Sequence, residues 1–193
     1  MPDGRRGFVV ADVAGKGLAA ALVMSNLQAT IRSQAPVTRS CSECAVNANR
    51  MLKASVSPGQ FVTLFLAALD PAQKVLSYCN AGHNPPYLFK PDGSLRELTV
   101  GGPIVGAFDG LPYEEETIPL SSGDVLAIYS DGVTEALNET GEMYGENRLV
   151  DAVRPVAARS APEILLAVTE SVGRFTGKTP AADDLTLMVI KAL

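Results

Sequence analysis

Histidine and cysteine are scarce in this sequence. Its 193 residues include one histidine, His83, and three cysteines, an odd number that suits a reducing compartment better than a framework of disulfides. Cys41 and Cys44 have the spacing of half a zinc site, but no second Cys/His pair exists, so we interpret them as small residues near a helix start. Ser130 precedes Asp131, yet no histidine lies in a matching motif, and a histidine-activated serine nucleophile is not predicted.

Clustered basic residues and long apolar runs are also missing. The formal net charge is −5, whereas contacts with nucleic-acid phosphates require clustered Lys and Arg, so nucleic acid is not expected as a partner. No apolar stretch approaches the roughly 20 residues that span a bilayer, and the polar, glycine-rich start differs from a signal peptide. We therefore expect a cytoplasmic protein without a membrane segment. With 47% hydrophobic residues, the chain can build the core of a single domain covering residues 1–193.

The sequence does contain three short motifs in which an apolar run meets an aspartate at a turn. They read ADVAGKG, YSDG and ADDLT, and their aspartates are Asp12, Asp131 and Asp183. Each apolar run is typical of a buried strand, so each aspartate is expected at a strand end. Carboxylates gathered in this way bind hard cations such as Mg²⁺ and Mn²⁺, whose retained waters can become nucleophiles. The motifs therefore predict a metal-dependent hydrolase.

The order of the expected elements indicates an α+β fold. Strands are expected at residues 7–13, 61–69, 74–78, 87–90, 94–100, 125–129 and 185–190, and helices at 16–34, 42–55, 145–158 and 161–175. Segments 61–78 and 87–100 each indicate a hairpin, and the second is more polar and is expected to be peripheral. Helices kept apart from hairpin-connected strands predict α+β layers rather than alternating βαβ units.

Each aspartate also has a purely structural interpretation. Asp12 could cap the following helix, Asp131 could form an Asx turn, and Asp183 could close the loop before the last strand. For any one aspartate alone, the structural interpretation is favoured. Three such residues, each at the end of an apolar strand, are harder to explain by capping.

Two other motifs invite functional hypotheses that the residues do not support. The pair Gly15-Lys16 suggests a Walker phosphate loop, but such a loop needs Gly and Ser or Thr where this sequence has Val10 and Gly17, which disfavours nucleotide binding. His83 lies in the segment AGHNPP and could act as a general acid. A histidine that is hydrogen-bonded inside a proline-bounded turn is commoner, so we assign His83 a structural role.

Several motifs, taken in order, resemble one family. The segments are DVAGKGLAAALVMS, FVTLFLAALD, LSYCNAGHNPPYLF, GGPIVGAF, SSGDVLAIYSDGVTEALN, MYGENRL and DDLTLMVI. They resemble the SpoIIE-like bacterial branch of the metal-dependent protein phosphatases, the protein phosphatase 2C superfamily, from about Gly7 to Ile190. The resemblance implies a four-layer α-β-β-α sandwich, in which helices flank an antiparallel β-sandwich. It also implies two Mn²⁺ or Mg²⁺ ions in a cleft at one end.

The resemblance further implies which residues bind the ions. Asp12 matches the aspartate that bridges both metals, and the carbonyl of Val13 matches a backbone ligand beside it. Asp131 and Asp183 match the aspartates that complete one metal site, with Asp184 as the alternative at the last motif. No side chain is expected to act as the nucleophile, because the resemblance assigns that role to metal-bound water.

The sequence departs from the family pattern at its start. Family members carry an upstream Gly-Asp-Tyr-Tyr-Asp-like segment whose acid binds the first metal, whereas only residues 1–6 precede the first strand here. Asp3 resembles part of a turn, and we do not assign it as the missing ligand. The resemblance thus implies a phosphatase domain cut within its first hairpin, with one metal site weakened and an open strand edge that could support a homodimer.

The function implied by the resemblance is hydrolysis of phosphoserine or phosphothreonine on a regulatory protein of the anti-anti-sigma type. One alternative is a catalytically impaired module that keeps the fold and binds a partner protein. A nucleotide-binding protein is the third hypothesis.

Overall fold

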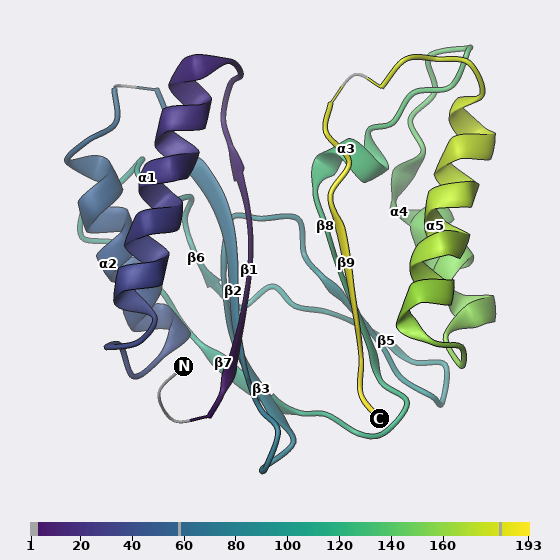
Figure 1. Ribbon diagram of the computed structural model, residues 1–193, viewed down its shortest axis with the longest axis horizontal. Helices are drawn as coiled ribbons and strands as arrows, with labels where there is room; N and C mark the ends of the chain where they lie inside the picture. The colour runs from purple at the N-terminus through teal and green to yellow at the C-terminus, as the bar shows by residue number, and fades with distance from the viewer. Residues whose placement is uncertain (1–3, 58, 182) are drawn as a thin grey trace. The chain divides into compact units, whose positions relative to one another are not determined.

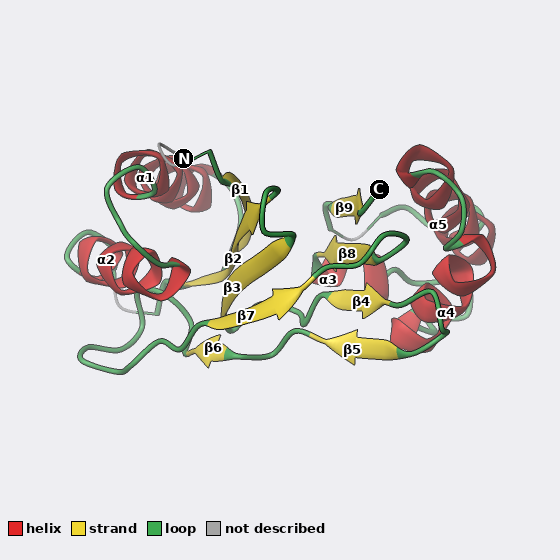
Figure 2. Ribbon diagram, turned by 90° about the horizontal axis from the view of Figure 1, so that it is seen from below, coloured by secondary structure: helices red, strands yellow, loops and turns green. Residues whose placement is uncertain are grey.

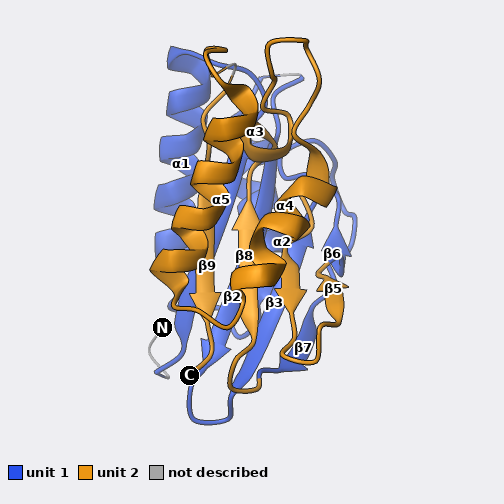
Figure 3. Ribbon diagram, turned by 90° about the vertical axis from the view of Figure 1, so that its right-hand side faces the viewer, with its two compact units in different colours: residues 1–83, 99–120 blue, residues 84–98, 121–193 orange. Residues whose placement is uncertain are grey.

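The computed structural model describes residues 4–57, 59–181 and 183–193. Asp3, which the sequence places in a turn, lies outside the described residues. The chain divides into two compact units: unit 1 comprises Met1–His83 and Thr99–Leu120, and unit 2 comprises Asn84–Leu98 and Ser121–Leu193 (Figure 3). Each unit is built from two separate stretches of sequence and is described by itself, so a single domain over residues 1–193 stays a prediction.

Unit 1 is a five-stranded sheet with two helices on one face (Figures 1 and 2). Its elements are β1 (Arg6–Val13), α1 (Leu18–Gln34), α2 (Cys41–Lys53), β2 (Val62–Asp70), β3 (Val75–Ala81), β6 (Gly101–Gly102) and β7 (Glu116–Pro119). β2 pairs antiparallel with β1 and with β3, which confirms the first predicted hairpin. β3 also pairs antiparallel with β7 and, over two residues, parallel with β6.

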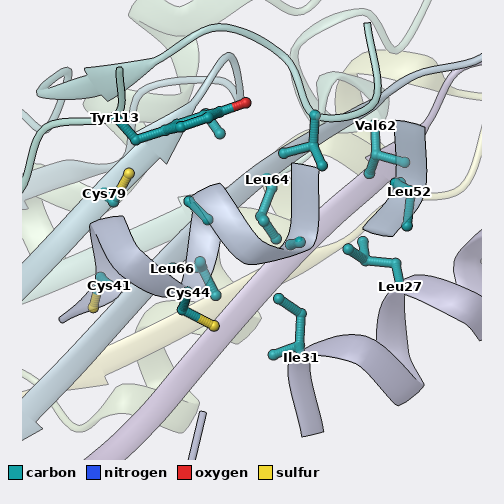
Figure 4. Close-up of a cluster of buried hydrophobic side chains, with 14 of the residues drawn as sticks. Leu27, Ile31, Cys41, Cys44, Leu52, Val62, Leu64, Leu66, Cys79 and Tyr113 are labelled. Carbon is teal, nitrogen blue, oxygen red and sulfur yellow. The ribbon is translucent and has the colours of Figure 1, made fainter. Parts of the chain in front are cut away.

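The register of β1 and β2 decides which side chains face the helices. Val13 lies opposite Val62, and both side chains join the core beneath α1 and α2. Figure 4 shows part of this core, including Leu27, Ile31, Leu52, Leu64 and Leu66. Successive residues of a strand point to opposite faces, so Asp12 and its cross-strand neighbour Thr63 point to the face that these helices do not cover.

The three cysteines belong to the same core (Figure 4). Cys41, Cys44 and Cys79 are buried, free thiols, and Cys41 Sγ donates to the carbonyl of Ser77 at 3.5 Å. Among the described residues, no group of three or more His, Cys, Asp or Glu could hold a metal ion. Cys41 and Cys44 therefore act as core residues near the start of α2, as the sequence suggested.

We expect these thiols to be unreactive in the folded protein. Burial, aided by the Glu115 carboxylate, raises the pKa of Cys79 to about 12, and burial also raises the pKa of Cys41 and of Cys44. A thiol-specific colour reagent at pH 8 should react with all three only after denaturation, because the thiolate is the nucleophile. A thiol that reacts in the native protein at the rate of a free thiol would contradict this burial.

The same shifts set a pH dependence of stability. Below the ordinary thiol pKa of about 8.5, the three thiols are protonated in both the folded and the unfolded chain. Their contribution to the free energy of unfolding is then fully present. Above it the unfolded chain ionises first, and the free energy of unfolding should fall as the pH rises towards about 12. Urea denaturation at pH 7.5 and 9.5 measures this loss, and replacement of Cys79 by Ala should reduce the difference.

Unit 2 is a four-stranded sheet in the order β5-β4-β8-β9, with helices packed on one face (Figure 2). Its elements are β4 (Tyr87–Phe89), β5 (Leu95–Glu97), β8 (Val125–Tyr129), α3 (Asp131–Thr134), α4 (Gly145–Val153), the 3₁₀ turn η1 (Arg154–Val156), α5 (Ala161–Thr176) and β9 (Leu187–Lys191). All pairings are antiparallel. Side chains of β4, β8, α4 and α5 form the core, among them Tyr129, Leu149 and Val168. The two units together confirm the predicted α+β class.

The second predicted hairpin forms, but its first strand is not peripheral. β4 pairs with both β5 and β8, and all three of its residues are buried. The polar character of segment 87–100 comes from the exposed turn and from β5, where Arg96 and Glu97 are exposed. The average polarity of residues 87–100 is therefore a poor guide to the burial of β4, the first strand of the hairpin.

Local features explain why α4 and β7 differ from the sequence prediction. The helix expected at 145–158 ends at Val153 and continues as η1, because Pro155 lacks an N–H and its ring obstructs the preceding turn. β7 was not predicted, because only Ile118 among its four residues is buried.

The helix expected at 161–175 is confirmed as α5, and its predicted cap is present. The N–H of Ser160 donates to the carboxylate of Glu163 at 3.0 Å. None of the helices in the described ranges is long and apolar enough to cross a membrane.

Candidate metal-binding site

Ser130 places the segments of Asp131 and Asp183 side by side in unit 2. The buried strand β8 ends at Tyr129, and Asp131 is the first residue of α3. Between them, Ser130 donates its hydroxyl to the carbonyl of Asp184 at 3.3 Å and accepts the N–H of Thr186 at 3.1 Å. The N–H of Ser130 also donates to the carbonyl of Thr186 at 3.0 Å. These bonds fix the loop before β9 against the start of α3.

The two unit 2 carboxylates are available for a cation. Asp131 is partly exposed, and its side chain makes no hydrogen bond or ion pair within the described part of the chain, so the Asx-turn interpretation is not supported. Asp183 is exposed, and its Oδ1 accepts the N–H of the next residue at 2.8 Å, which leaves lone pairs for other ligands. Asp183 also lines a pocket of about 410 Å³ together with Gly132, Met143 and Leu185.

In unit 1, Asp12 and Val13 lie at the end of an edge strand. β1 is the first strand in the order of its sheet. The N–H of Ala14 donates to the carbonyl of Phe61 at 3.0 Å, whereas Val62 pairs through its N–H and C=O with Val105 instead. Hydrogen-bonded and non-hydrogen-bonded pairs alternate along antiparallel strands, so Val13, opposite Val62, directs its carbonyl away from β2. That carbonyl is oriented towards the side of β1 on which the described residues form no neighbouring strand.

The helix-capping interpretation of Asp12 is not supported. Helix α1 begins at Leu18, and its N-cap residue is Gly17. Asp12 is exposed and lies within β1, on the face that α1 and α2 do not cover. Asp12 and Val13 thus belong to unit 1, whereas Asp131 and Asp183 belong to unit 2, and the convergence of the three carboxylates stays a prediction.

Two other aspartates at strand ends show what a structural carboxylate looks like in this protein. Asp70, at the end of β2, accepts the N–H groups of Ala72 and Gln73 at 2.9 Å each and so closes a turn. Asp124, before β8, is 1% exposed and pairs with Lys90 Nζ at 2.6 Å. Asp131 has no such partner among the described residues, which separates it from both.

His83 has the buried, hydrogen-bonded environment that the sequence suggested. Its side chain is buried, and its Nδ1 lies 2.9 Å from Thr63 Oγ1. Asn80, also buried, donates to the carbonyl of His83 at 3.0 Å and accepts its N–H at 2.8 Å. These contacts hold the AGHNPP turn at the end of β3.

The comparison with known families gives a match over nearly the whole chain. The family model described as "Stage II sporulation protein E (SpoIIE)" matches residues 2–193. The chain belongs to the SpoIIE family. This result confirms the resemblance that the ordered motifs indicated.

Relatives and solved structures agree with this membership. RsbU of Bacillus subtilis strain 168, described as a phosphoserine phosphatase, is 28% identical over 185 residues, which are 95% of this chain and 55% of RsbU. The SiaA-PP2C domain of Pseudomonas aeruginosa has a TM-score of 0.84 at 24% identity. This match covers 97% of this chain and 78% of the SiaA-PP2C chain. The RsbU and RsbW domains of Rv1364c from Mycobacterium tuberculosis have a TM-score of 0.80 at 27% identity. This match covers 97% of this chain and 53% of the Rv1364c chain. The chain therefore spans about half of RsbU.

More distant neighbours of this SpoIIE-family chain share its fold and hold divalent ions. The catalytic domain of the phosphatase PstP was solved with two manganese ions. It matches with a TM-score of 0.65 at 16% identity, over 95% of this chain and 86% of the PstP chain. RsbX was solved in complex with magnesium. It matches with a TM-score of 0.67 at 18% identity, over 96% of this chain and 85% of the RsbX chain.

Ser130 and Gly132 are site residues to which sequence reasoning gave no role. The sequence invites only a nucleophile role for Ser130, although its place beside Asp131 in the YSDG motif could have suggested a hydrogen-bonding role. Gly132 is buried, and a Cβ atom at this residue would lie 2.3 Å from the carbonyl oxygen of Asp184. Only glycine lets α3 approach the loop before β9 this closely.

We expect Gly132→Ala to destabilise unit 2 and to weaken metal binding. The added methyl group would push the Asp184 backbone away, at a cost of roughly 1–3 kcal/mol in the free energy of unfolding. Gly173→Ala is the matched control, because its Cβ would meet nothing within 4 Å and alanine favours the helix. Denaturant titration with and without Mn²⁺ checks both effects, and a Gly132→Ala protein as stable as the Gly173→Ala protein would contradict the packing.

Proposed function

We propose that this SpoIIE-family chain is a protein phosphatase domain that hydrolyses phosphoserine or phosphothreonine with the help of Mn²⁺ or Mg²⁺. The observation that carries the proposal is the attachment of the Asp131 and Asp183 segments to each other through Ser130. It fixes the two segments that carry these carboxylates against each other, and within the described residues neither carboxylate pairs with a Lys or Arg side chain. Family membership and the phosphoserine phosphatase RsbU support the same activity.

The available donor atoms fit hard divalent ions. All are oxygens, which Mg²⁺ and Mn²⁺ prefer over nitrogen and sulfur. In the proposal, the carboxylate of Asp12 would be shared by the two ions, the carbonyl of Val13 would serve as a ligand beside it, and Asp131 and Asp183 would supply the other carboxylate ligands. The outward carbonyl of Val13 suits its role, and so does the side chain of Asp131, which has no hydrogen bond or ion pair within the described ranges. Mn²⁺ and Mg²⁺ in PstP and RsbX support the choice of ions.

When bound, the two ions would supply positive charge for the phosphoryl oxygens and a water of lowered pKa for in-line attack. The residues of the chain provide orientation. Ser130 and Gly132 hold Asp131 and the loop of Asp183 at a fixed spacing. Burial raises the pKa of Tyr129, which therefore stays protonated at the end of β8. No acid or base step is required of it.

A covalent phosphoenzyme is not part of the proposal. Ser130 is buried, and its hydroxyl is used in hydrogen bonds to the Asp184 carbonyl and the Thr186 N–H. Burial raises the pKa of the cysteine thiols, so thiolates are not available as nucleophiles at neutral pH. Water is therefore the nucleophile in the proposal.

We propose a phosphorylated regulatory protein of the anti-anti-sigma type as the substrate, with sigma-factor regulation as the process. The pocket beside Asp183 gives room for residues that flank the phosphoserine. Three buried free thiols suit the reducing cytoplasm, which is the compartment we propose. The outer edge of β1, along which no strand pairs in the described part of the chain, supports a homodimer. Light scattering at high protein concentration tests this last part, and a strict monomer would contradict it.

The activity is tested by release of phosphate from a phosphoserine-bearing anti-anti-sigma protein and from a small aryl phosphate. We expect both reactions to require Mn²⁺ or Mg²⁺ and to stop with a chelator. Binding of the phosphoprotein without release of phosphate from either substrate would support the alternative, a module that has kept the fold and lost catalysis.

A further inference from the structure

Thr63 connects the single histidine of the sequence to the strand position opposite Asp12. In the antiparallel pair of β1 and β2, Asp12 lies directly opposite Thr63, and both point to the face not covered by α1 and α2. Residues directly opposite each other have Cβ atoms about 4.5–5.5 Å apart, within reach of a hydroxyl and a carboxylate. Thr63 Oγ1 lies 2.9 Å from Nδ1 of His83.

His83 is held too firmly to adapt to Thr63, so it can impose an orientation on it. The histidine is 4% exposed, and its backbone N–H and C=O are both bound by the amide of Asn80, which is also 4% exposed. These two bonds fix the backbone of His83, and from that fixed position its ring makes the Nδ1 contact with Thr63. Thr63 itself is partly exposed and carries one hydroxyl proton.

We propose that His83 and Thr63 are positioning residues for the carboxylate of Asp12. The proposal rests on the proposed function, in which Asp12 is a metal ligand. A carboxylate accepts hydrogen bonds only, so Thr63 must direct its single proton towards Asp12. Thr63 Oγ1 must then accept from His83, and Nδ1 of His83 must carry the ring proton. A metal-binding carboxylate that receives such a hydrogen bond keeps its orientation and binds more tightly.

The single histidine makes the tautomer directly measurable. A ¹⁵N-histidine-labelled sample of the 193-residue chain gives ring signals from His83 alone. We expect the Nδ1-protonated neutral tautomer, and we expect these signals to shift when Mg²⁺ is added. In Thr63→Val the Mg²⁺ response should disappear. An Nε2-protonated ring in the wild-type protein, or an unchanged response in Thr63→Val, would overturn the proposal.

Metal affinity gives a second readout, independent of activity. Thr63→Val keeps the side-chain shape and removes the hydroxyl, so we expect Mn²⁺ binding about 10-fold weaker in calorimetric titration. Thr63→Ser should retain affinity. Thr117→Val is the matched control, since it removes a hydroxyl that meets Ser77 Oγ at 2.7 Å elsewhere in unit 1. Equal Mn²⁺ affinity of the two valine variants would show that Thr63 serves the fold alone.

Substitutions of His83 test the direction of the hydrogen bond. An asparagine amide nitrogen lies near the place of Nδ1, so His83→Asn should retain more Mn²⁺ affinity than His83→Leu. Urea denaturation identifies any variant that fails to fold. If a His83 variant does not fold, the Mn²⁺ affinities of Thr63→Val and Thr63→Ser decide whether the positioning role is correct. Affinities that are equal in folded His83→Asn and His83→Leu would overturn the role of the Nδ1 proton.

Failure of this proposal is distinguishable from failure of the metal site. If Asp12→Asn leaves Mn²⁺ binding unchanged, the proposed metal site is wrong and the positioning role is wrong with it. If Asp12→Asn abolishes binding while Thr63→Val binds as the wild-type protein does, only the positioning role is wrong.

Discussion

Asp131→Asn is expected to lower Mn²⁺-dependent phosphatase activity by at least about 100-fold, more than the loss found when residues behind a metal ligand are changed. The substitution replaces a charged ligand with a neutral amide of the same shape. The free energy of unfolding should change by less than about 0.5 kcal/mol, because the Asp131 side chain has no hydrogen bond or ion pair within the described residues. Function and folding should therefore separate at this residue.

Asp70→Asn is the matched control for Asp131→Asn. Asp70 also follows an apolar strand, but its Oδ1 accepts two turn N–H groups that an asparagine oxygen can still accept. We expect this variant to keep wild-type activity and Mn²⁺ affinity. An Asp131→Asn protein with full activity in the same assay would contradict the assignment of Asp131.

Asp12→Asn is expected to have the larger effect on metal binding. A carboxylate shared by two cations offsets their mutual repulsion, and its loss weakens both ions at once, whereas loss of Asp131 weakens one. Calorimetric titration with Mn²⁺ should detect no site in Asp12→Asn and only the weaker of the two sites in Asp131→Asn. Asp12→Asn should also show no measurable phosphatase activity.

The two variants can be compared only if both remain folded. Urea denaturation in the absence of metal provides this check for each protein. Equal loss of Mn²⁺ binding in Asp12→Asn and Asp131→Asn would show that Asp12 is an ordinary ligand of one ion and not a bridge.

Much of the fold follows from local sequence patterns. The apolar run of β2 and the turn after it predicted the central hairpin of unit 1, and the Ser160–Glu163 signature predicted the start of α5. Patterns that average over a segment were less reliable. The buried strand β4 was obscured by the polar residues of its hairpin, and β7 has a single buried side chain.

The sequence suggests the carboxylates of the candidate site, whose convergence stays a prediction, but not the residues that support them. Asp12, Asp131 and Asp183 stand out because each lies where an apolar run meets a turn. Ser130 and Asp184 are separated by 54 positions, and no local pattern indicates that they are hydrogen-bonded. The close approach at Gly132 and the contact between Thr63 and His83 are long-range in the same way. Such contacts arise from strand order and register, which only the folded chain determines.

Anomalous diffraction from crystals grown with Mn²⁺ tests the central claim most directly. We predict a manganese peak within about 2.0–2.6 Å of carboxylate oxygens from Asp12, Asp131 and Asp183. The same map would show whether Asp183 or Asp184 is the ligand from the last motif. If any of the three carboxylates lies more than about 5 Å from every manganese ion, roughly twice a ligand distance, the assignment of the metal site is wrong.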